Sequence, residues 1–192
     1  MFSLQKPSSS EVNKFIATQK DKPFSYPDQG ISKNKEPLGY VMDHNRIELG
    51  KGKETFLQAI AAIKSWQMFN FSWLEICWPN APIEQGTTVA VMVKHFGIWS
   101  LNAARIVYTL EESGDIERFG FAYGTLPIHA ESGEERFSVE WHHQDNSVWY
   151  DLLAFSKPNY LVVKLGYPVC RMLQKKFAQD SKKAMMLATN PK

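Results

Sequence analysis

The chain lacks the residue patterns that most directly indicate a chemical activity. Its two cysteines, Cys77 and Cys170, form no CxxC motif and have no zinc-ligand spacing with histidines. Neither a GxGxxG turn leading into a helix nor a GxSxG nucleophile elbow is present. We therefore expect no metal and no cofactor, and a serine or cysteine nucleophile is not indicated.

Strong net charge and long hydrophobic runs are also missing. The formal net charge is +2, which is too small to indicate the clustered basic face of a protein that binds duplex nucleic acid. No window contains the roughly 18 apolar residues of a membrane-spanning helix, and the first residues have no apolar signal segment. We expect a cytoplasmic protein with no nucleic-acid partner and no membrane span.

What the chain does have is the composition of a folded domain. It is 44% hydrophobic and 22% charged, and 192 residues suffice for one domain with a full core. Residues 1–38 contain four prolines and a serine run, so we expect an irregular N-terminal arm with weak helical character over Glu11–Gln19. We expect residues 39–190 to form a single domain.

Hydrophobic periodicity predicts many strands and two helices. Helical spacing indicates an amphipathic helix over Lys53–Met68 and a long C-terminal helix from about Tyr160 to about Leu187. Pro168 lacks an N–H group, so a kink or break is expected near Gly166. Short polar turns between the strands indicate an antiparallel meander. The predicted strands are Tyr40–Leu49, Trp73–Trp78, Thr87–His95, Asn102–Glu111, Ile116–Leu126, Glu134–His143 and Val148–Phe155.

This order of elements predicts an α+β fold. A curved antiparallel sheet of about seven strands would grip the long, kinked C-terminal helix, since a sheet of this kind must cover one face. The arrangement resembles the helix-grip fold of the START and birch-pollen-allergen-like superfamily. A sheet that curves around a helix leaves room for a cavity between them.

The segment Phe119–Val139 carries a more specific resemblance. It reads FGFAYGTLPIHAESGEERFSV, with three glycines, a histidine and three acids in one strand–loop–strand unit. It is similar to the signature of domain-of-unknown-function family 1990, and FSYPDQG, GTTVAV, RIVY and AFSKP follow the same family in order. The family often has Gly-His-Pro where this chain has Ile128-His129-Ala130, which changes the loop. The family's activity is not established, so the resemblance implies a fold and a functional region but transfers no catalytic residue.

Within that segment, strand alternation places Glu135 on the same face as Phe137 and Trp141. A carboxylate on an apolar face needs a partner or a raised pKa. Glu135 is therefore either a site residue or half of a structural pair. His129, in the glycine-bounded loop, is either a site residue or a hydrogen-bond partner that holds the loop. We predict a ligand pocket formed by Tyr108, Tyr123, His129, Glu135, Phe137 and Trp141.

Three functions remain open at this point. The first is binding of a small apolar or amphipathic ligand between the sheet and the C-terminal helix, in an aromatic pocket with few polar anchors. The second is an enzyme that uses Glu135 or His129 as acid or base on a cyclic or carbonyl substrate. The third is a non-enzymatic interaction module. The basic residues of the last helix are typical of a solvated face. Contact with an anionic membrane surface or with nucleic acid is the alternative, which the small net charge disfavours. The oligomeric state is left open.

Overall fold

The computed structural model describes residues 1–33, 39–158 and 167–190. Its strands form one antiparallel sheet in the order β2-β8-β7-β6-β5-β4-β3, and the short β1 pairs with β5 outside that path. The strands are β1 (Phe2–Ser3), β2 (Val41–Lys51), β3 (Leu74–Ile76), β4 (Thr88–His95), β5 (Ile98–Glu112), β6 (Ile116–Thr125), β7 (Glu131–His142) and β8 (Ser147–Pro158). The helices are α1 (Ser9–Gln19), α2 (Gly52–Lys64) and α4 (Tyr167–Thr189), with short 3-10 turns η1 (Ile31–Lys33) and η2 (Gln67–Phe69).

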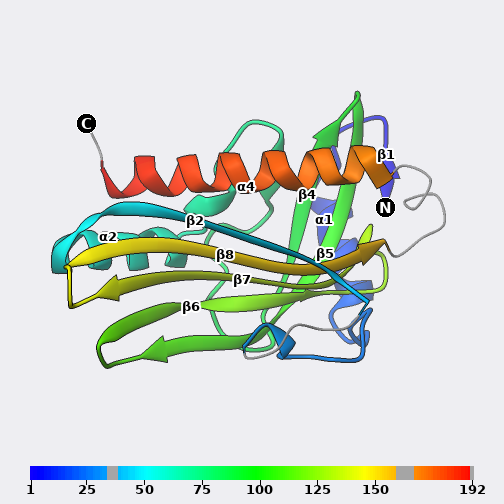
Figure 1. Cartoon of the computed structure of the whole chain (residues 1–192). Coiled ribbons are helices and arrows are strands. Elements are labelled where there is room, and N and C mark those ends of the chain that lie inside the picture. Colours follow the sequence, from blue (N-terminus) through cyan, green and yellow to red (C-terminus); the bar gives the residue numbers. More distant parts are fainter. Residues whose placement is uncertain (34–38, 159–166, 191–192) are drawn as a thin grey trace.

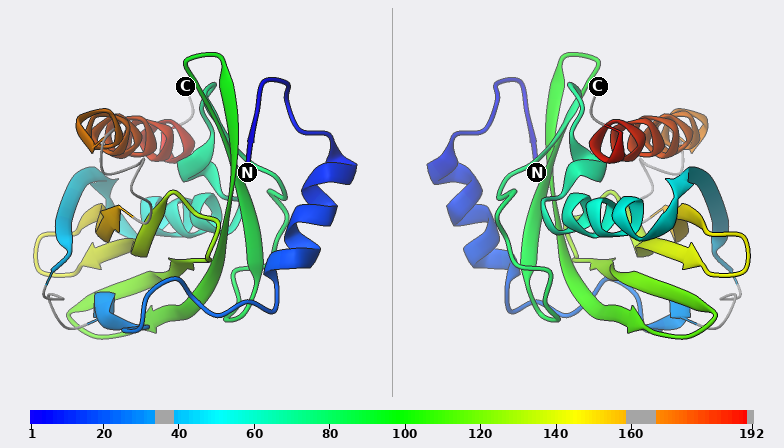
Figure 2. Two further views of the ribbon diagram at one scale, coloured as in Figure 1. Left: turned by 90° about the vertical axis from the view of Figure 1, so that its right-hand side faces the viewer. Right: turned by 90° about the vertical axis from the view of Figure 1, so that its left-hand side faces the viewer.

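The predicted architecture is confirmed. Every strand pair is antiparallel, and the sheet curls so that α2 and α4 lie against its inner face (Figures 1 and 2). Pairing follows the alternation of the sequence, with Phe121 opposite Phe137 and Tyr123 opposite Glu135. Short polar turns bring consecutive strands side by side in antiparallel order, so the sequence pattern was sufficient to predict their pairing.

The main core lies between the inner face of the sheet and the two helices. Phe56 and Ile63 of α2 and Met185 of α4 pack there against strand residues such as Phe121 and Phe137. Phe121 and Phe137 stack at a ring-centroid separation of 5.3 Å. Full burial of each such side chain stabilises the fold by about 2 kcal/mol, so this aromatic layer helps to hold the two helices against the sheet.

The N-terminal arm is more ordered than its prolines indicate. The weak helical pattern becomes α1, which begins at a capping box: the Ser8 side chain accepts from the Glu11 backbone, and Glu11 accepts from the Ser8 backbone. Val12 and Phe15 of α1 pack on the outer face of β4 and β5 in a second, smaller core. The arm therefore runs along the outer face of the sheet, opposite α2 and α4 (Figure 2).

One helix boundary differs from the predicted one. The helix predicted to reach Met68 ends at Lys64, because Trp66 adopts a left-handed backbone with φ of 55°. The described part of the C-terminal helix is continuous from Tyr167 to Thr189 and includes Pro168. Its predicted start near Tyr160 and the predicted kink near Gly166 lie outside the described residues.

Strict alternation of inner and outer side chains along β5 ends at Ile106. A β-bulge between Ile106 and Tyr108 shifts the register against β6, so these two residues no longer share a face. Ile106 remains in the main core, whereas Tyr108 turns to the outer face and its hydroxyl bonds with Ser32 of η1 at 2.7 Å. Alternation alone does not reveal a bulge, because the extra residue leaves both halves of the strand alternating.

Candidate ligand cavity

A cavity of about 490 Å³ lies between α4 and the inner face of the sheet. Most of its wall is apolar and comes from many separate parts of the chain, so no single motif builds it. Its apolar lining includes Phe69, Val91, Val93, Leu152, Phe177 and Ala178. Its volume falls within the range of small-molecule sites in proteins.

Glu135 is one of the acids that line this cavity. It is half-buried on β7 and accepts a hydrogen bond from the Tyr123 hydroxyl at 2.8 Å. Burial raises the pKa of Glu135 to about 7; the Tyr123 hydrogen bond acts in the opposite direction, and the charge of Asp43 adds to the rise. The carboxyl group therefore changes its protonation state near neutral pH, inside an apolar wall.

His129 reaches the same cavity from the β6–β7 loop. The loop turns tightly, because the His129 N–H donates to the Leu126 carbonyl at 2.9 Å. The ring Nδ1 lies 3.0 Å from the Glu131 N–H, from which it can accept, and 3.1 Å from the Glu131 carbonyl oxygen, to which it can donate in the other tautomer. Burial lowers the pKa of His129 to about 4, so the imidazole is neutral at pH 7.

The structure brings three of the six predicted site residues to the cavity or its wall and sets the others apart. Tyr123, His129 and Glu135 line it. Phe137 lies in the core behind the lining and contacts Tyr123 at a ring-centroid distance of 5.2 Å. The structure places Tyr108 on the outer face and Trp141 at the far end of β7, where its indole N–H donates to Asn146 at 2.8 Å.

Sequence reasoning missed several lining residues, and one of them carried a readable signal. His95 shares the parity of Val91 and Val93 on β4, so alternation would have placed it on the inner face. Its Nδ1 atom is buried and has no hydrogen-bond partner among the described residues, and burial lowers the pKa of His95. The lining residue Asp43 is paired with Arg171 of α4 at 2.7 Å, and this pair had no local signal, because 128 residues separate the two.

The neighbour of Glu135 has the opposite surroundings. Glu134 points to the outer face, is 2% exposed, and accepts from the Tyr26 hydroxyl at 2.7 Å, the Gly30 N–H at 2.8 Å, and the N–H and hydroxyl of Ser32. A Cβ atom at Gly124 would overlap the Tyr26 hydroxyl, so this glycine makes room for the arm. One carboxylate thus fastens the N-terminal arm to the sheet.

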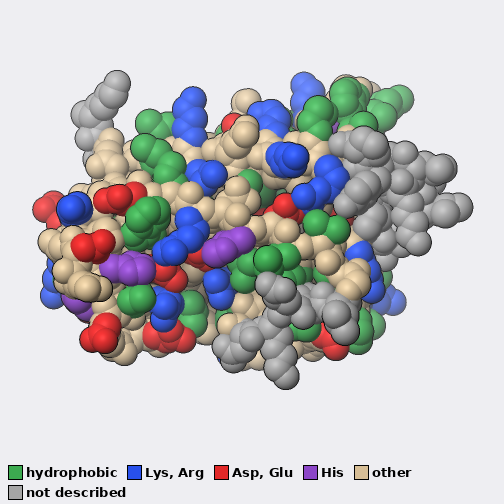
Figure 3. Space-filling view, in the orientation of Figure 1, with side chains coloured by type: hydrophobic (Ala, Val, Ile, Leu, Met, Phe, Trp, Pro, Cys, Tyr) green, Lys and Arg blue, Asp and Glu red, His purple; other side chains and the backbone are tan. Residues whose placement is uncertain are grey.

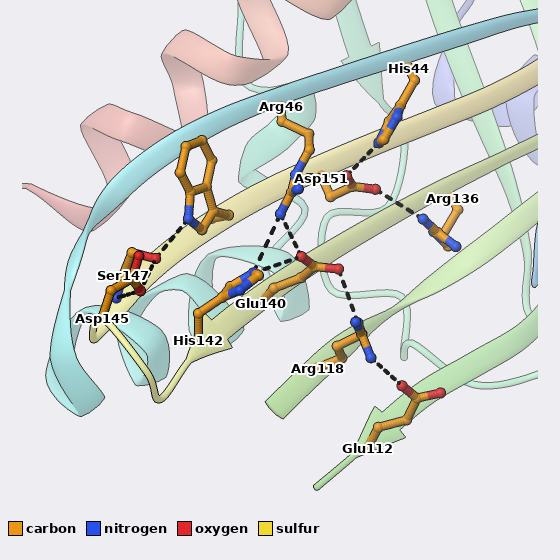
Figure 4. Close-up of polar contacts among 11 residues, drawn as sticks. His44, Arg46, Glu112, Arg118, Arg136, Glu140, His142, Asp145, Ser147 and Asp151 are labelled. Carbon is orange, nitrogen blue, oxygen red and sulfur yellow. Dashed lines mark hydrogen bonds and ion pairs between the residues drawn. The ribbon is translucent and has the colours of Figure 1, made fainter. Parts of the chain in front are cut away.

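Two further acids are paired on the outer face, as Figure 4 shows. Asp151 is 2% exposed and accepts from Arg136 at 3.0 Å, while Glu140 accepts from Arg118 at 3.0 Å and from Arg46 at 2.6 Å. His44 also contacts Asp151, at 2.6 Å. These pairs are typical of a structural ion network, in which each buried charge has several partners.

The described residues contain neither a metal-ligand cluster nor a membrane-crossing helix. In the part of the chain that the structure describes, no three His, Cys, Asp or Glu side chains are grouped to hold a metal ion. Cys77 and Cys170 are both free thiols. None of the described helices combines the length and the apolar character that crossing a bilayer requires.

Comparisons with known proteins identify relatives but no activity. Residues 25–184 match the family described as "Domain of unknown function (DUF1990)". A UPF0548 protein of Dictyostelium discoideum is 36% identical over 98% of this chain and 95% of that protein. The UPF0548 protein At2g17695 of Arabidopsis thaliana is 33% identical over 79% of this chain and 75% of that protein. Hypothetical protein jhp0584 of Helicobacter pylori shares the fold, with a TM-score of 0.52 and 11% identity over 88% of this chain and 96% of that one.

Proposed function

Because the chain belongs to the DUF1990 family of unknown function, we propose from its own geometry that it binds a small amphipathic molecule between the sheet and α4. The observation that carries this proposal is the cavity of about 490 Å³, with a largely apolar wall that contains the partly buried carboxyl group of Glu135. Packing alone gives no reason to leave such a volume beside Glu135, since unfilled space and a buried acid both destabilise a fold.

The cavity has the polarity of a site for a mostly apolar molecule with one polar group. Tyr123 and Glu135 form one polar group in the wall. The Nδ1 atom of His95, which has no partner among the described residues, offers a second place for a hydrogen bond. A hydroxyl or amine on the ligand could bind at either place, whereas the apolar body would contact Leu152 and Phe177. Binding would then combine apolar burial with a small number of orienting hydrogen bonds.

A cavity-filling variant tests the proposal. Ala154→Phe places a phenyl ring in the cavity from β8, and Ala61→Phe makes the same change on the exposed surface of α2. We expect 1-anilinonaphthalene-8-sulfonate, an amphipathic fluorescent probe, to bind the unmodified protein and Ala61→Phe, and to bind Ala154→Phe at least about tenfold more weakly. Equal binding by both variants, with melting temperatures like that of the parent, would exclude the cavity as the site.

Substitution of the polar lining separates site residues from structural ones. Glu135→Gln and His129→Ala should weaken probe binding while the protein stays folded. If His129 serves the loop alone, its substitution should instead reduce stability by about 1–3 kcal/mol with binding intact. Thermal melts at pH 5, where Glu135 is largely protonated, run beside the probe titration, distinguish the two results.

A second candidate function is acid–base catalysis on the bound molecule. It is favoured by a pKa of about 7 at Glu135, since a carboxyl group of that pKa can accept and return a proton at neutral pH. Among the described contacts, the hydrogen bond of Glu135 goes to Tyr123 and not to His129. Proton exchange at an acidic C–H of a carbonyl ligand, followed in deuterated water and absent in Glu135→Gln, would favour this candidate over simple binding.

A further inference from the structure

Four exposed apolar side chains are adjacent in sequence to residues that line the cavity. Phe96, at the tip of the β4–β5 hairpin, is 74% exposed, and Met172 on α4 is 52% exposed. Ile128 of the β6–β7 loop and Val169 of α4 are also exposed. We call these four residues the apolar rim. Each is adjacent in the sequence to one lining residue. In the order in which the four were named, these lining residues are His95, Leu173, His129 and Cys170.

The rim comes from three elements that are distant in the sequence. Large exposed side chains occur singly on most protein surfaces, but a group around one opening is typical of an interaction site. Phe96 also has a left-handed backbone, with φ of 49°, which is uncommon for a residue other than glycine. The hairpin therefore presents a phenyl ring at its tip with an unfavourable backbone, although a glycine at that position would avoid the cost.

Positive charge lies beside the apolar rim. α4 contains Arg171, Lys175, Lys176, Lys182 and Lys183 against one acid, Asp180, so this single helix is more positive than the whole chain with its net charge of +2. In Figure 3, Lys and Arg side chains gather along the upper edge, where α4 runs, and hydrophobic side chains lie along the same edge. Lys94 precedes the hairpin tip by two residues.

The acids near the rim cancel only part of this charge. Asp43 is paired with Arg171, and Asp180 is paired with Lys176, so the positive charge of Lys175, Lys182 and Lys183 on α4 is not offset by these two acids. Burial raises the pKa of Glu131, so its negative charge is disfavoured. An apolar surface flanked by lysines fits an anionic bilayer, in which apolar side chains enter the headgroup boundary and lysines contact the lipid phosphates.

We propose that the apolar rim and the basic face of α4 dock the protein on an anionic membrane surface, with the cavity mouth toward the lipid. The docking itself does not depend on what the cavity binds. That the docked protein exchanges an amphipathic ligand with the bilayer rests on the proposed function. The proposal concerns peripheral attachment and requires no membrane-crossing segment.

Vesicle flotation with the full chain tests the docking. We expect binding to vesicles of phosphatidylcholine that contain about one third phosphatidylglycerol, weak binding to phosphatidylcholine alone, and release by high salt. The double variant Phe96→Ser/Met172→Ser should bind about tenfold more weakly or less. The control Leu57→Ser removes a side chain of α2 that is 53% exposed and belongs neither to the rim nor to α4, and it should bind like the parent.

Several results would overturn the proposal. These are absence of binding to anionic vesicles, equal loss in the rim and control variants, and equal binding to both kinds of vesicle. Self-association that Phe96→Ser/Met172→Ser abolishes, in a chain that does not bind vesicles, would assign the rim to a second copy instead. Ala154→Phe, with its cavity filled, should still float with anionic vesicles, so failure of the ligand proposal and failure of docking give different results.

Discussion

Glu134 and Glu135 are neighbours on β7, yet their side chains lie on opposite faces of the sheet and have different hydrogen-bond partners. Glu134, on the outer face, accepts from three residues of the N-terminal arm. Glu135, on the inner face, has the Tyr123 hydroxyl as its described partner and a pKa of about 7. The outer face satisfies its buried acids completely, as an architectural element must. The inner face leaves one acid poorly compensated beside a cavity, which is a common property of functional sites.

The largest expected effect is on the outer face. Glu134→Ala removes the acceptor of several charge-assisted hydrogen bonds and leaves buried donors of the arm without a partner. We expect a loss of about 4 kcal/mol in the free energy of unfolding. Urea unfolding measures it, and Glu48→Ala, an exposed acid on the outer face of β2, should change stability by less than about 0.5 kcal/mol. A loss below about 1 kcal/mol for Glu134→Ala would remove the role of this carboxylate in holding the arm.

On the inner face, Glu135→Gln should change the pH dependence of stability. The pKa of Glu135 is raised from 4.5 to about 7 in the folded state, so between these values the unfolded chain loses its proton first. Ionisation therefore favours unfolding as pH rises through this window, and the cost is complete above pH 7. At pH 8 the variant should be more stable than the parent by up to about 3 kcal/mol, and at pH 4 the two should be equal. Unfolding curves that stay parallel from pH 4 to pH 8 would contradict this assignment.

A smaller loss is expected at the ion network of the outer face. Asp151→Asn weakens the pairs with Arg136 and Arg46 that Figure 4 shows. We expect a loss of about 2 kcal/mol, less than a fully buried pair would lose, because the Arg46 side chain is 37% exposed. Glu112→Gln, at the exposed edge of the same network, is the control and should change stability little. Similar losses at both positions would show that burial does not govern these pairs.

The smallest expected effect is that of Tyr123→Phe. It removes the hydroxyl that donates to Glu135, which is the contact that holds the pKa of this carboxyl down. The pKa of Glu135 should rise further, and stability should fall by about 1 kcal/mol. The pH at which the decline in stability ends should move upward, because the folded-state pKa sets that end of the window, and unfolding curves at closely spaced pH values detect this. A downward shift would mean that the phenol does not stabilise the carboxylate.

The sequence predicted the layout of this molecule better than the details of its site. Strict alternation and short polar turns were enough for the sheet, and parity correctly set Glu135 against Glu134. Alternation shows which face of the sheet a side chain is on, but not how far along the strand it lies. Trp141 was therefore placed in the same pocket as His129, although His129 precedes β7 and Trp141 lies near its other end. The β5 bulge that turns Tyr108 outward left no local signal. The partners of Glu134 lie more than 100 residues away, and such pairs depend on the finished fold.

A direct titration of Glu135 tests the contrast between the two faces most sharply. Carbon-13 NMR of side-chain-labelled glutamates follows each carboxyl group with pH, and the signal absent from Glu135→Gln identifies this residue. We predict a midpoint near pH 7 in the free protein, which shifts when 1-anilinonaphthalene-8-sulfonate fills the cavity. A midpoint near the ordinary value of 4.5, unchanged by the probe, would contradict the account of a ligand cavity built beside a poorly compensated acid.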